Sequence, residues 1–360
     1  MNICLIGNSL TNFVLAIILI NRKIKVDLYQ NSKKKIFDDR TIGISEENIK
    51  FLKKNNICLN NITWPIKRIE IFNEKNRKNK ILHFKNENSN CFSMIKNYDF
   101  YKILKKKLIK NTLFREKLIK NNLPINNILN NYDLVINSDQ NSWISKKYFT
   151  KKIFKDYKSQ AYVSTISHKK CTNDTAIQIF TRFGPLAYLP ISENKTSVVF
   201  SIVDQKKLKE NEIISLIKEY NLNYKIYDLS KISKFKLKFS LLRNYFYKNL
   251  LAFGDCIHQI HPLAGQGFNM SLRDITILSN IIDEKIELGL EIDSSIPKIF
   301  EKKTKSSNLI FSSGIDFIYE FFKFDNMVKN NFSKNIFHSI ENKTLLNRHI
   351  KSLADKGLVF

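Results

Sequence analysis

The chain has 360 residues, of which 43% are hydrophobic and 12% aromatic, and its formal net charge is +27 at neutral pH. This length is too great for one small core and predicts two interleaved domains with a helical tail. The charge alone would favour nucleic acid or an anionic membrane surface as a partner. However, the lysines are scattered among asparagine, isoleucine and phenylalanine, as an AT-rich genome imposes, and no nucleic-acid-binding module is recognisable. We therefore expect no nucleic-acid partner.

The five cysteines lie far apart and form no Cys-x-x-Cys pair, which predicts neither a disulfide framework nor a metal site. The longest apolar run, residues 13–20, is too short to span a bilayer. Met1 leads almost directly into a strand and leaves no room for a targeting peptide. We expect a cytoplasmic protein, with peripheral contact at the inner membrane of a bacterium as the alternative.

The N-terminal pattern predicts a βαβ unit. Residues 3–6 are typical of a buried strand that ends at Gly7, residues 10–20 have helical length and spacing, and residues 25–29 alternate as a second strand. A βαβ unit at this position is typical of dinucleotide binding.

A further buried strand is predicted at residues 132–136, ending in a polar turn at Asp139. Between about 155 and 245 the pattern becomes one of alternating β-branched and aromatic residues, which predicts a separate sheet. Its strands are expected at residues 161–167, 175–183 and 196–203, with interruptions at Gly184-Pro185 and at Pro190.

Residues 250–253 resume the first pattern as a buried strand running into Gly254. From Phe268 onward, apolar residues recur at spacings of three and four, which predicts a helix. The chain from about residue 296 is rich in lysine and phenylalanine and helical in period.

The most informative segment is residues 251–274. Its strand ends at Asp255, which places a carboxylate at the edge of a sheet where ligands bind. The turn from Pro262 to Gly267 then opens directly into the predicted helix. Glycines in such a turn allow close backbone approach to a flat ligand, and the helix N-terminus favours an anion such as a reduced flavin.

This segment resembles the flavin-binding motif of the para-hydroxybenzoate-hydroxylase superfamily, and most closely its ubiquinone-biosynthesis branch, the UbiH/VisC type. The matching pattern is Gly-Asp-x-x-His-x-x-His-Pro-x-x-Gly-Gln-Gly-x-Asn-x-x-x-x-Asp, beginning at Gly254. Three further stretches resemble the family: Asp39-Arg40-Thr-Ile-Gly-Ile-Ser45, Phe183-Gly-Pro-Leu-Ala-Tyr-Leu-Pro190 and Ser313-Gly-Ile-Asp316.

The resemblance implies an α/β fold in which a Rossmann-like FAD-binding domain is interleaved with an antiparallel-sheet substrate domain and followed by C-terminal helices. It implies non-covalent FAD, NADH or NADPH as co-substrate, O2, and a polyprenylated phenol whose ring is hydroxylated, without a metal. The expected boundaries are 1–64, 97–154 and 246–295 for the FAD-binding domain, 65–96 and 155–245 for the substrate domain, and 296–360 for the helical region.

The resemblance also implies the cofactor contacts. The chemistry is flavin-mediated, so no catalytic side chain is assigned, and the loop facing the flavin ring contains Pro262, Gly265 and Gly267. The full set of expected cofactor-binding residues is Gly7, Ser9, Gln30, Arg40, Asp139, Asp255, Pro262, Gly265, Gln266, Gly267, Phe268 and Asn269.

The N-terminal fingerprint departs from the family, which has Gly-x-Gly-x-x-Gly where this chain has Gly7, Ser9 and Asn12. The side chains of Ser9 and Asn12 are expected to crowd the pyrophosphate, so replacing both with glycine should tighten FAD binding. Gln30 replaces the acidic residue expected at the end of the second strand, and the family's Asp-Gly turn is Asp139-Gln140 here.

Several alternatives remain open. Cys256, His258 and His261 could suggest a zinc site, but no further ligand is evident in the sequence. The aromatic run 317–324 is interpreted as core between helices, with a membrane-facing amphipathic surface as the alternative. The competing functions are a non-catalytic scaffold subunit of a ubiquinone-biosynthesis complex and a flavin-dependent reductase of an isoprenoid or aromatic substrate.

Overall fold

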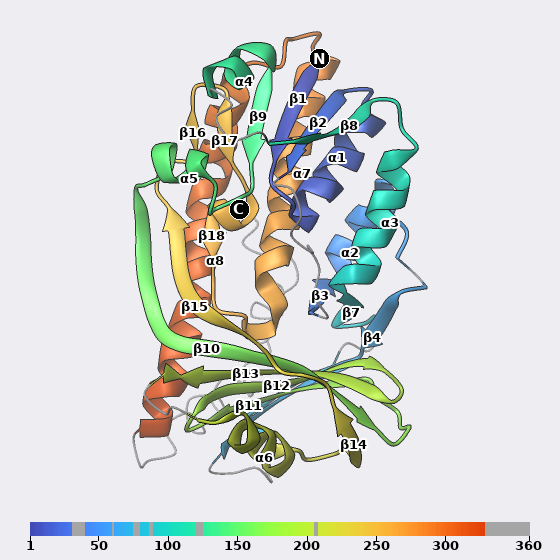
Figure 1. The fold of residues 1–360 in the computed structure, drawn as a ribbon, viewed down its shortest axis with the longest axis vertical. Coiled ribbons are helices and arrows are strands. Elements are labelled where there is room, and N and C mark those ends of the chain that lie inside the picture. Colours follow the sequence, from blue (N-terminus) through green and yellow to red (C-terminus); the bar gives the residue numbers. More distant parts are fainter. Residues whose placement is uncertain are drawn as a thin grey trace.

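The computed structural model describes residues 1–30, 40–59, 61–74, 80–85, 89–119, 125–204 and 208–327. Within these ranges the strands form three sheets arranged in two main layers, a six-stranded sheet at one end of the molecule and a nine-stranded sheet at the other (Figure 1). This architecture confirms the predicted α/β fold, with a second sheet that is antiparallel except for one parallel pair of strands.

The six-stranded sheet has the order β16-β17-β9-β1-β2-β8, and all neighbours are parallel except the pair β16 and β17. Because β1, β2, β9 and β17 run the same way, the segments that follow them meet at one edge. The strands are β1 (Asn2–Ile6), β2 (Lys25–Gln30), β8 (Phe114–Leu118), β9 (Leu134–Asn137), β16 (Phe246–Tyr247) and β17 (Leu250–Ala252).

Helix α1 (Leu10–Asn21) joins β1 to β2 and confirms the predicted βαβ unit. Residues 10–20 are all buried, because α1 lies between the sheet and the helices α3 (Asn97–Ile109) and α7 (Gln266–Glu287). A helix covered on every side needs no polar face, which explains its nearly continuous apolar sequence.

The nine-stranded sheet is built around β10 (Lys152–His168), a long bent strand that pairs with both β13 (Lys195–Val203) and β15 (Ser233–Leu242) (Figure 1). Helix α6 (Glu210–Tyr220) packs on one face of this sheet through Ile213, Ile217 and Tyr220. The other strands are β5 (Arg68–Asn73), β6 (Leu82–Lys85), β11 (Thr175–Thr181), β12 (Gly184–Ser192), β14 (Ile226–Leu229) and β18 (His258–Gln259).

The predicted interruptions of this sheet are wrong, because Gly184, Pro185 and Pro190 all lie within β12. Gly184 begins the strand with φ +135°, a backbone conformation that suits glycine. Pro185 is next to this strand end, and Pro190 precedes an irregularity in the pairing of β12 with β13. Prolines are tolerated at both kinds of position because a ladder hydrogen bond is already missing there.

A three-stranded sheet of β3 (Thr41–Ser45), β7 (Phe92–Lys96) and β4 (Thr63–Ile66) lies between the two layers. Helix α8 (Ser295–Met327) contacts α7 and β16 at one end of the molecule and β11 and β15 at the other (Figure 1). The remaining helices are α2 (Glu46–Lys54), α4 (Ile125–Asn131) and α5 (Trp143–Tyr148).

In the part of the chain that the structure describes, no helix is both long and apolar enough to cross a membrane. The five cysteines all lie in described ranges and are free thiols. The predicted helical region from residue 296 is helical as far as residue 327, and the remainder, residues 328–360, lies outside the described ranges.

Candidate cofactor site

The sheet brings four of the predicted cofactor residues to one edge. Gly7 follows β1, Gln30 ends β2, Asp139 follows β9 and Asp255 follows β17, and these four strands are direct neighbours. At Gly7 the backbone has φ +108°, and an added Cβ would lie 3.0 Å from the Cβ of Asp139. The turn after β1 therefore needs glycine both for its conformation and for its closeness to the turn after β9.

Ser9 and Asn12 are both used inside the protein. The Ser9 hydroxyl caps α1 by accepting a hydrogen bond from the Asn12 backbone N–H, and it shares a 2.7 Å hydrogen bond with the Ser138 hydroxyl. The Asn12 side chain is fully buried and donates to the carbonyl oxygens of Ile6 (3.0 Å) and Gly7 (2.9 Å). Asn12 therefore points at the end of β1 and braces the turn, which removes the physical basis for the predicted crowding by its side chain.

The turn at Asp139 forms without the glycine that the family has at the next position. The Asp139 carboxylate accepts from the Asn141 backbone N–H at 2.9 Å, and the hydroxyls of Ser142 and Ser145 both donate to the Asp139 carbonyl oxygen at 2.7 Å. An aspartate that bonds its own backbone two residues on is a common way to build a turn. Side-chain hydrogen bonds therefore substitute for glycine in this loop.

Asp255 lies on the short helix η3 (Gly254–Cys256), directly after β17. Its side chain is exposed, although the surrounding protein raises the pKa of its carboxyl group and the charges of His258 and Arg40 oppose that effect. Because solvent reaches the carboxylate, we take the ionised form to prevail at neutral pH. The influence of Arg40 places both residues in the same neighbourhood, and the Arg40 guanidinium lies 5.8 Å from the ring centre of Phe235. Asp39 lies outside the described residues.

The turn that begins at Pro262 leads through η4 (Leu263–Gly265) directly into α7. Gly265 has φ +65°, and an added Cβ would lie 3.3 Å from the Gly43 backbone nitrogen on β3. At Gly267 an added Cβ would meet only Ile260, at 4.0 Å, so the backbone of the first turn is open to a ligand. A helix N-terminus with room in front of it suits an anionic or polar group.

Asn269 uses its whole side chain to hold this turn against β3 and α2. Its amide nitrogen donates to the carbonyl oxygens of Gly43 (2.9 Å) and Gly265 (3.3 Å). Its amide oxygen accepts from the Ser45 backbone N–H (3.0 Å) and the Asn48 side chain (2.9 Å). With two donors and two acceptor positions occupied, the Asn269 side chain positions the loop. Phe268 packs edge to face on the ring of Phe100.

The three residues that suggested a zinc site face different surroundings. The His258 ring donates through Nε2 to the buried Asp274 carboxylate at 2.9 Å. The Cys256 thiol is 3.5 Å from the Ser145 hydroxyl, and His261 lies between two tyrosine rings. Among the described residues, no group of three potential ligands could hold a metal ion.

The partners that hold this region together could not be identified from the sequence. Asp274 also accepts from the Asn308 side chain on α8 at 3.2 Å, so a buried chain of polar groups links β18, α7 and α8. The only signal for it was Asp274 itself, the last residue of the resemblance pattern. Asn48 and Asn308 had no sequence signal, because their partners lie far away along the chain.

The residues present at this edge fit a dinucleotide such as FAD. Among the described residues of this edge, four have a buried side-chain atom without a hydrogen-bond partner: the amide oxygens of Asn8, Asn12 and Gln266 and the amide nitrogen of Gln30. Unsatisfied buried polar atoms cost free energy, and a bound ligand can satisfy them. Gln30 at the end of β2 is where the ribose hydroxyls of a dinucleotide bind in this kind of fold.

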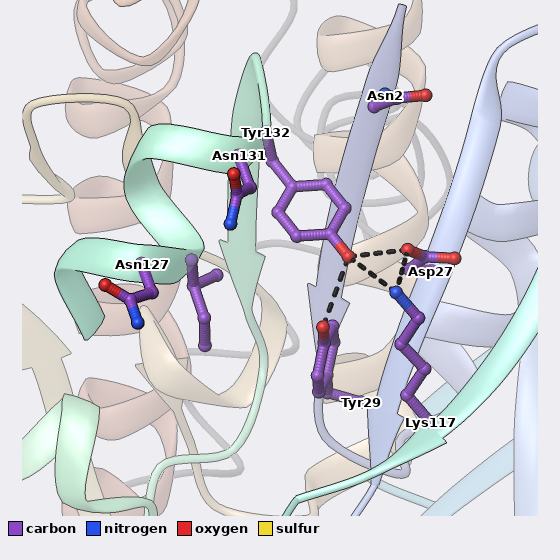
Figure 2. A pocket seen from close by; sticks show the side chains of 8 residues that line it. Asn2, Asp27, Tyr29, Lys117, Asn127, Asn131 and Tyr132 are labelled. Atoms are coloured by element: carbon purple, nitrogen blue, oxygen red, sulfur yellow. Dashed lines mark hydrogen bonds and ion pairs between the residues drawn. The ribbon is translucent and has the colours of Figure 1, made fainter. Parts of the chain in front are cut away.

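A separate hollow of about 270 Å³ lies beside α4, away from this edge. Figure 2 shows that Lys117 and the Tyr132 hydroxyl converge on the Asp27 carboxylate, at 2.7 and 2.5 Å. The charges in the hollow are thus paired with each other, and none of the predicted site residues lines it. The remaining lining residues are Asn2, Tyr29, Asn127, Ile128 and Asn131.

Comparison with known proteins supports the assignment of the edge. A family model described as an FAD binding domain matches residues 197–287, which include the segment 254–274. The chain is 28% identical over 186 residues to the mitochondrial ubiquinone biosynthesis monooxygenase COQ6 of Dictyostelium discoideum, covering 41% of this chain and 38% of that protein. It is 29% identical over 178 residues to the 3-demethoxyubiquinol 3-hydroxylase of Escherichia coli strain K12, covering 46% and 45%.

These matches therefore span less than half the length of either relative. Among solved structures, pqsL from Pseudomonas aeruginosa, a probable FAD-dependent monooxygenase, superimposes with a TM-score of 0.74 at 11% identity. The superposition covers 95% of this chain and 100% of that chain. At this identity the likeness concerns the fold, and it agrees with the architecture described above.

Proposed function

We propose that the chain is an FAD-dependent aromatic hydroxylase that acts on the phenol ring of a polyprenylated ubiquinone precursor, as its similarity to an FAD binding domain and to ubiquinone-biosynthesis monooxygenases supports. NADH or NADPH and O2 are the proposed co-substrates. The observation that carries the proposal is the edge of the six-stranded sheet, where Gly7, Gln30 and Asp255 meet the glycine turn that opens α7.

The proposed roles follow from the positions of these residues. Gly7 and the N-terminus of α1 hold the pyrophosphate, the Gln30 amide binds the ribose, and Asp255 binds a hydroxyl of the ribityl chain. Gly267 and the first turn of α7 lie against the flavin ring. These segments are kept in place by five residues: Asp139, Ser9, Pro262, Gly265 and Asn269. At the margin of the cofactor site lie Arg40, Gln266 and Phe268.

Bound FAD would supply the redox chemistry, taking a hydride from NAD(P)H and activating O2 for insertion into the ring. The protein would contribute binding, orientation and the exclusion of water. Asn269 is central to this role because it fixes the loop in front of the flavin to β3 through four hydrogen bonds. A loop fixed in advance need not be ordered when the substrate binds.

We assign the segments 1–64, 97–154 and 246–295 to FAD binding, 65–96 and 155–245 to the substrate, and 296–360 to the helical region. Peripheral contact with the inner membrane of a bacterium belongs to the same proposal. It is supported by apolar side chains that α8 exposes, namely Leu309, Ile310, Phe317, Ile318 and Phe324. A surface of this kind suits an enzyme whose substrate carries a polyprenyl tail.

The test combines FAD titration with complementation. Asp255→Ala should weaken FAD binding about tenfold or more without changing the fold, since Asp255 is exposed and packs in no core. The matched control is Asp228→Ala, which removes an exposed carboxylate on β14, far from the edge. Binding of FAD is followed by absorption, and the fold is followed by circular dichroism.

In a strain that lacks a ubiquinone ring hydroxylase, the wild-type and Asp228→Ala genes should restore quinone that contains oxygen from labelled O2. The Asp255→Ala gene should not. Restoration by all three genes alike would support the scaffold function, and a product without labelled oxygen would support the reductase. The absence of FAD binding at high micromolar concentration would reject all enzymatic versions.

A further inference from the structure

An aromatic cluster fills the space between the nine-stranded sheet, the flavin loop and α8. The buried members of this aromatic cluster come from β10, β11, β15, η4 and α8. Its rim consists of partly buried residues that include Phe235 and Ile260. The buried members are Tyr157, Ala161, Phe180, Leu237, Phe239, Leu241, Leu263, Ile315, Tyr319 and Phe322.

His261 lies in this apolar surrounding with only 1% of its surface exposed. Its ring stacks on Tyr319, with the centres 4.3 Å apart, and meets Tyr157 edge to face at 5.3 Å. Neither ring nitrogen of His261 has a hydrogen-bond partner. The Tyr157 hydroxyl makes no hydrogen bond of regular geometry, and burial together with the nearby Asp316 carboxylate raises its pKa. The two unsatisfied nitrogens of His261 in an apolar surrounding represent a substantial cost in free energy of folding.

Each of the two other buried histidines among the described residues has at least one hydrogen-bond partner. His168 bonds through both nitrogens, to the Lys169 carbonyl oxygen at 2.9 Å and to the Thr196 hydroxyl at 3.0 Å. His258 donates through Nε2 to the Asp274 carboxylate at 2.9 Å, while its Nδ1 has no partner. His261 is the exception, and the surroundings that hold it are rings and aliphatic side chains. Packing alone does not call for a histidine at this position, because phenylalanine has nearly the same shape and no unsatisfied atoms.

The cluster borders the proposed cofactor edge. His261 immediately precedes Pro262, and its other neighbour, Ile260, is the residue that approaches Gly267. At the rim, Phe235 lies beside Arg40, which in turn acts on Asp255. A group bound at His261 would thus lie between the sheet and the first turn of α7.

We propose that His261 and Tyr157 bind the hydroxyl group of the phenol ring and thereby place the ring between β10, α8 and the flavin loop. This assignment rests on the proposed function and names the side chains that select a phenol. A phenol hydroxyl donates one hydrogen bond and accepts others, so it can satisfy an imidazole nitrogen and the Tyr157 hydroxyl together. Burial lowers the pKa of His261 to about 3, so its ring is neutral and can accept a hydrogen bond.

The surrounding rings suit an aromatic ligand, because edge-to-face and offset contacts are favourable among aromatic groups. Since His261 is buried, entry of the ring requires that partly buried side chains packed against the cluster, such as Phe235 and Ile260, move aside. His261 and Tyr157 act as binding and positioning residues in this scheme, and neither forms a covalent bond with the substrate.

The test compares two probes that differ only in the hydroxyl group, 2-allylphenol and allylbenzene. Their dissociation constants are measured by calorimetry with the wild-type protein, saturated with FAD and also free of FAD. The wild type should bind 2-allylphenol about tenfold or more tightly than allylbenzene, as expected for a site with buried polar partners. In His261→Phe this ratio should fall towards one, while the affinity for allylbenzene and for FAD stays the same.

Tyr157→Phe should reduce the ratio in the same direction and also serves if His261→Phe fails to fold. Tyr319→Phe is the matched control: it keeps the stack on His261, and the hydroxyl that it removes bonds to Ser159 instead. An unchanged ratio in both His261→Phe and Tyr157→Phe, or no preference for the phenol in the wild type, would overturn the assignment. Because calorimetry needs no flavin signal, loss of FAD binding would be recognised separately as a failure of the proposed function.

Discussion

His261 should make the protein sensitive to acid. Its pKa is lowered by burial to about 3, whereas a histidine in the unfolded chain has its ordinary value near 6.5. Between these two values the unfolded state binds a proton that the folded state does not, so the free energy of unfolding falls as the pH falls from 6.5 towards 3. In this range each pH unit corresponds to about 1.4 kcal/mol, so His261 should lower the free energy of unfolding by roughly 3 kcal/mol at pH 4.5 relative to neutral pH.

The perturbation is His261→Phe, which keeps the ring stack and removes the proton-binding nitrogens. We expect urea unfolding at pH 7.5 to show a variant at least as stable as the wild type, because unsatisfied nitrogens are lost. At pH 4.5 the variant should be more stable by roughly 3 kcal/mol beyond that difference, because all other titrating groups are common to both proteins. The control variant His83→Gln changes an exposed histidine, and its stability difference from the wild type should be the same at pH 7.5 and pH 4.5. An equal difference between variant and wild type at both pH values would refute the reasoning.

Two further substitutions test how the flavin loop is held. Asn269→Leu removes the hydrogen bonds of its side chain to the Ser45 N–H and the Gly43 carbonyl oxygen. The variant should lose about 2–4 kcal/mol of stability in thermal unfolding and bind FAD more weakly. An unchanged melting temperature would show that Asn269 does not hold the flavin loop. Gly265→Ala should cost more than Gly289→Ala, because both glycines have φ +65° but only at Gly265 would the Cβ meet a backbone, that of Gly43. Equal losses, each about 1–2 kcal/mol, would mean that only the left-handed conformation matters.

The sheet edge could be predicted from the sequence, because buried parallel strands are nearly continuous apolar runs whose last residues mark where ligands bind. The runs before Gly7 and Gly254 were visible in this way, and the structure places them two strands apart in one sheet. The partners of buried polar side chains could not be predicted. Asn269 bonds to Ser45, 224 residues away, and no local pattern encodes such a pair.

Because local patterns do not encode long-range partners, the sequence also could not predict that β12 contains prolines or that both ring nitrogens of His261 lack hydrogen-bond partners. In a sequence, Pro185 and Pro190 indicate an interruption. Only the pairing with the neighbouring strands shows that Pro185 lies near the start of β12 and that Pro190 lies beside an irregularity in the pairing, where proline is tolerated. His261 belongs to a pattern shared with the family, but its burial between Tyr157 and Tyr319 depends on β10 and α8, which lie about a hundred residues before it and about sixty after it.

The glycine fingerprint at the N-terminus provides the last test, since the sequence and the structure predict opposite results. From the sequence, the Ser9→Gly, Asn12→Gly double variant should bind FAD more tightly by relieving crowding. In the structure, Asn12→Gly removes two hydrogen bonds to the carbonyl oxygens at the end of β1 and puts a glycine in the first turns of α1. Ser9→Gly removes the cap, which costs a few tenths of a kcal/mol, and also the hydrogen bond to the Ser138 hydroxyl.

We therefore expect the double variant to be less stable by about 2–4 kcal/mol and to bind FAD no more tightly than the wild type. Most of the loss should appear in Asn12→Gly alone, and Ser9→Gly alone should lower the free energy of unfolding by less in urea unfolding. Tighter FAD binding in Asn12→Gly with unchanged stability would show that this side chain obstructs the cofactor after all. The Asn12 amide nitrogen is 3.0 Å or less from both carbonyl oxygens that it binds. The structure therefore predicts that the Asn12 side chain supports the turn after β1 and does not obstruct the cofactor.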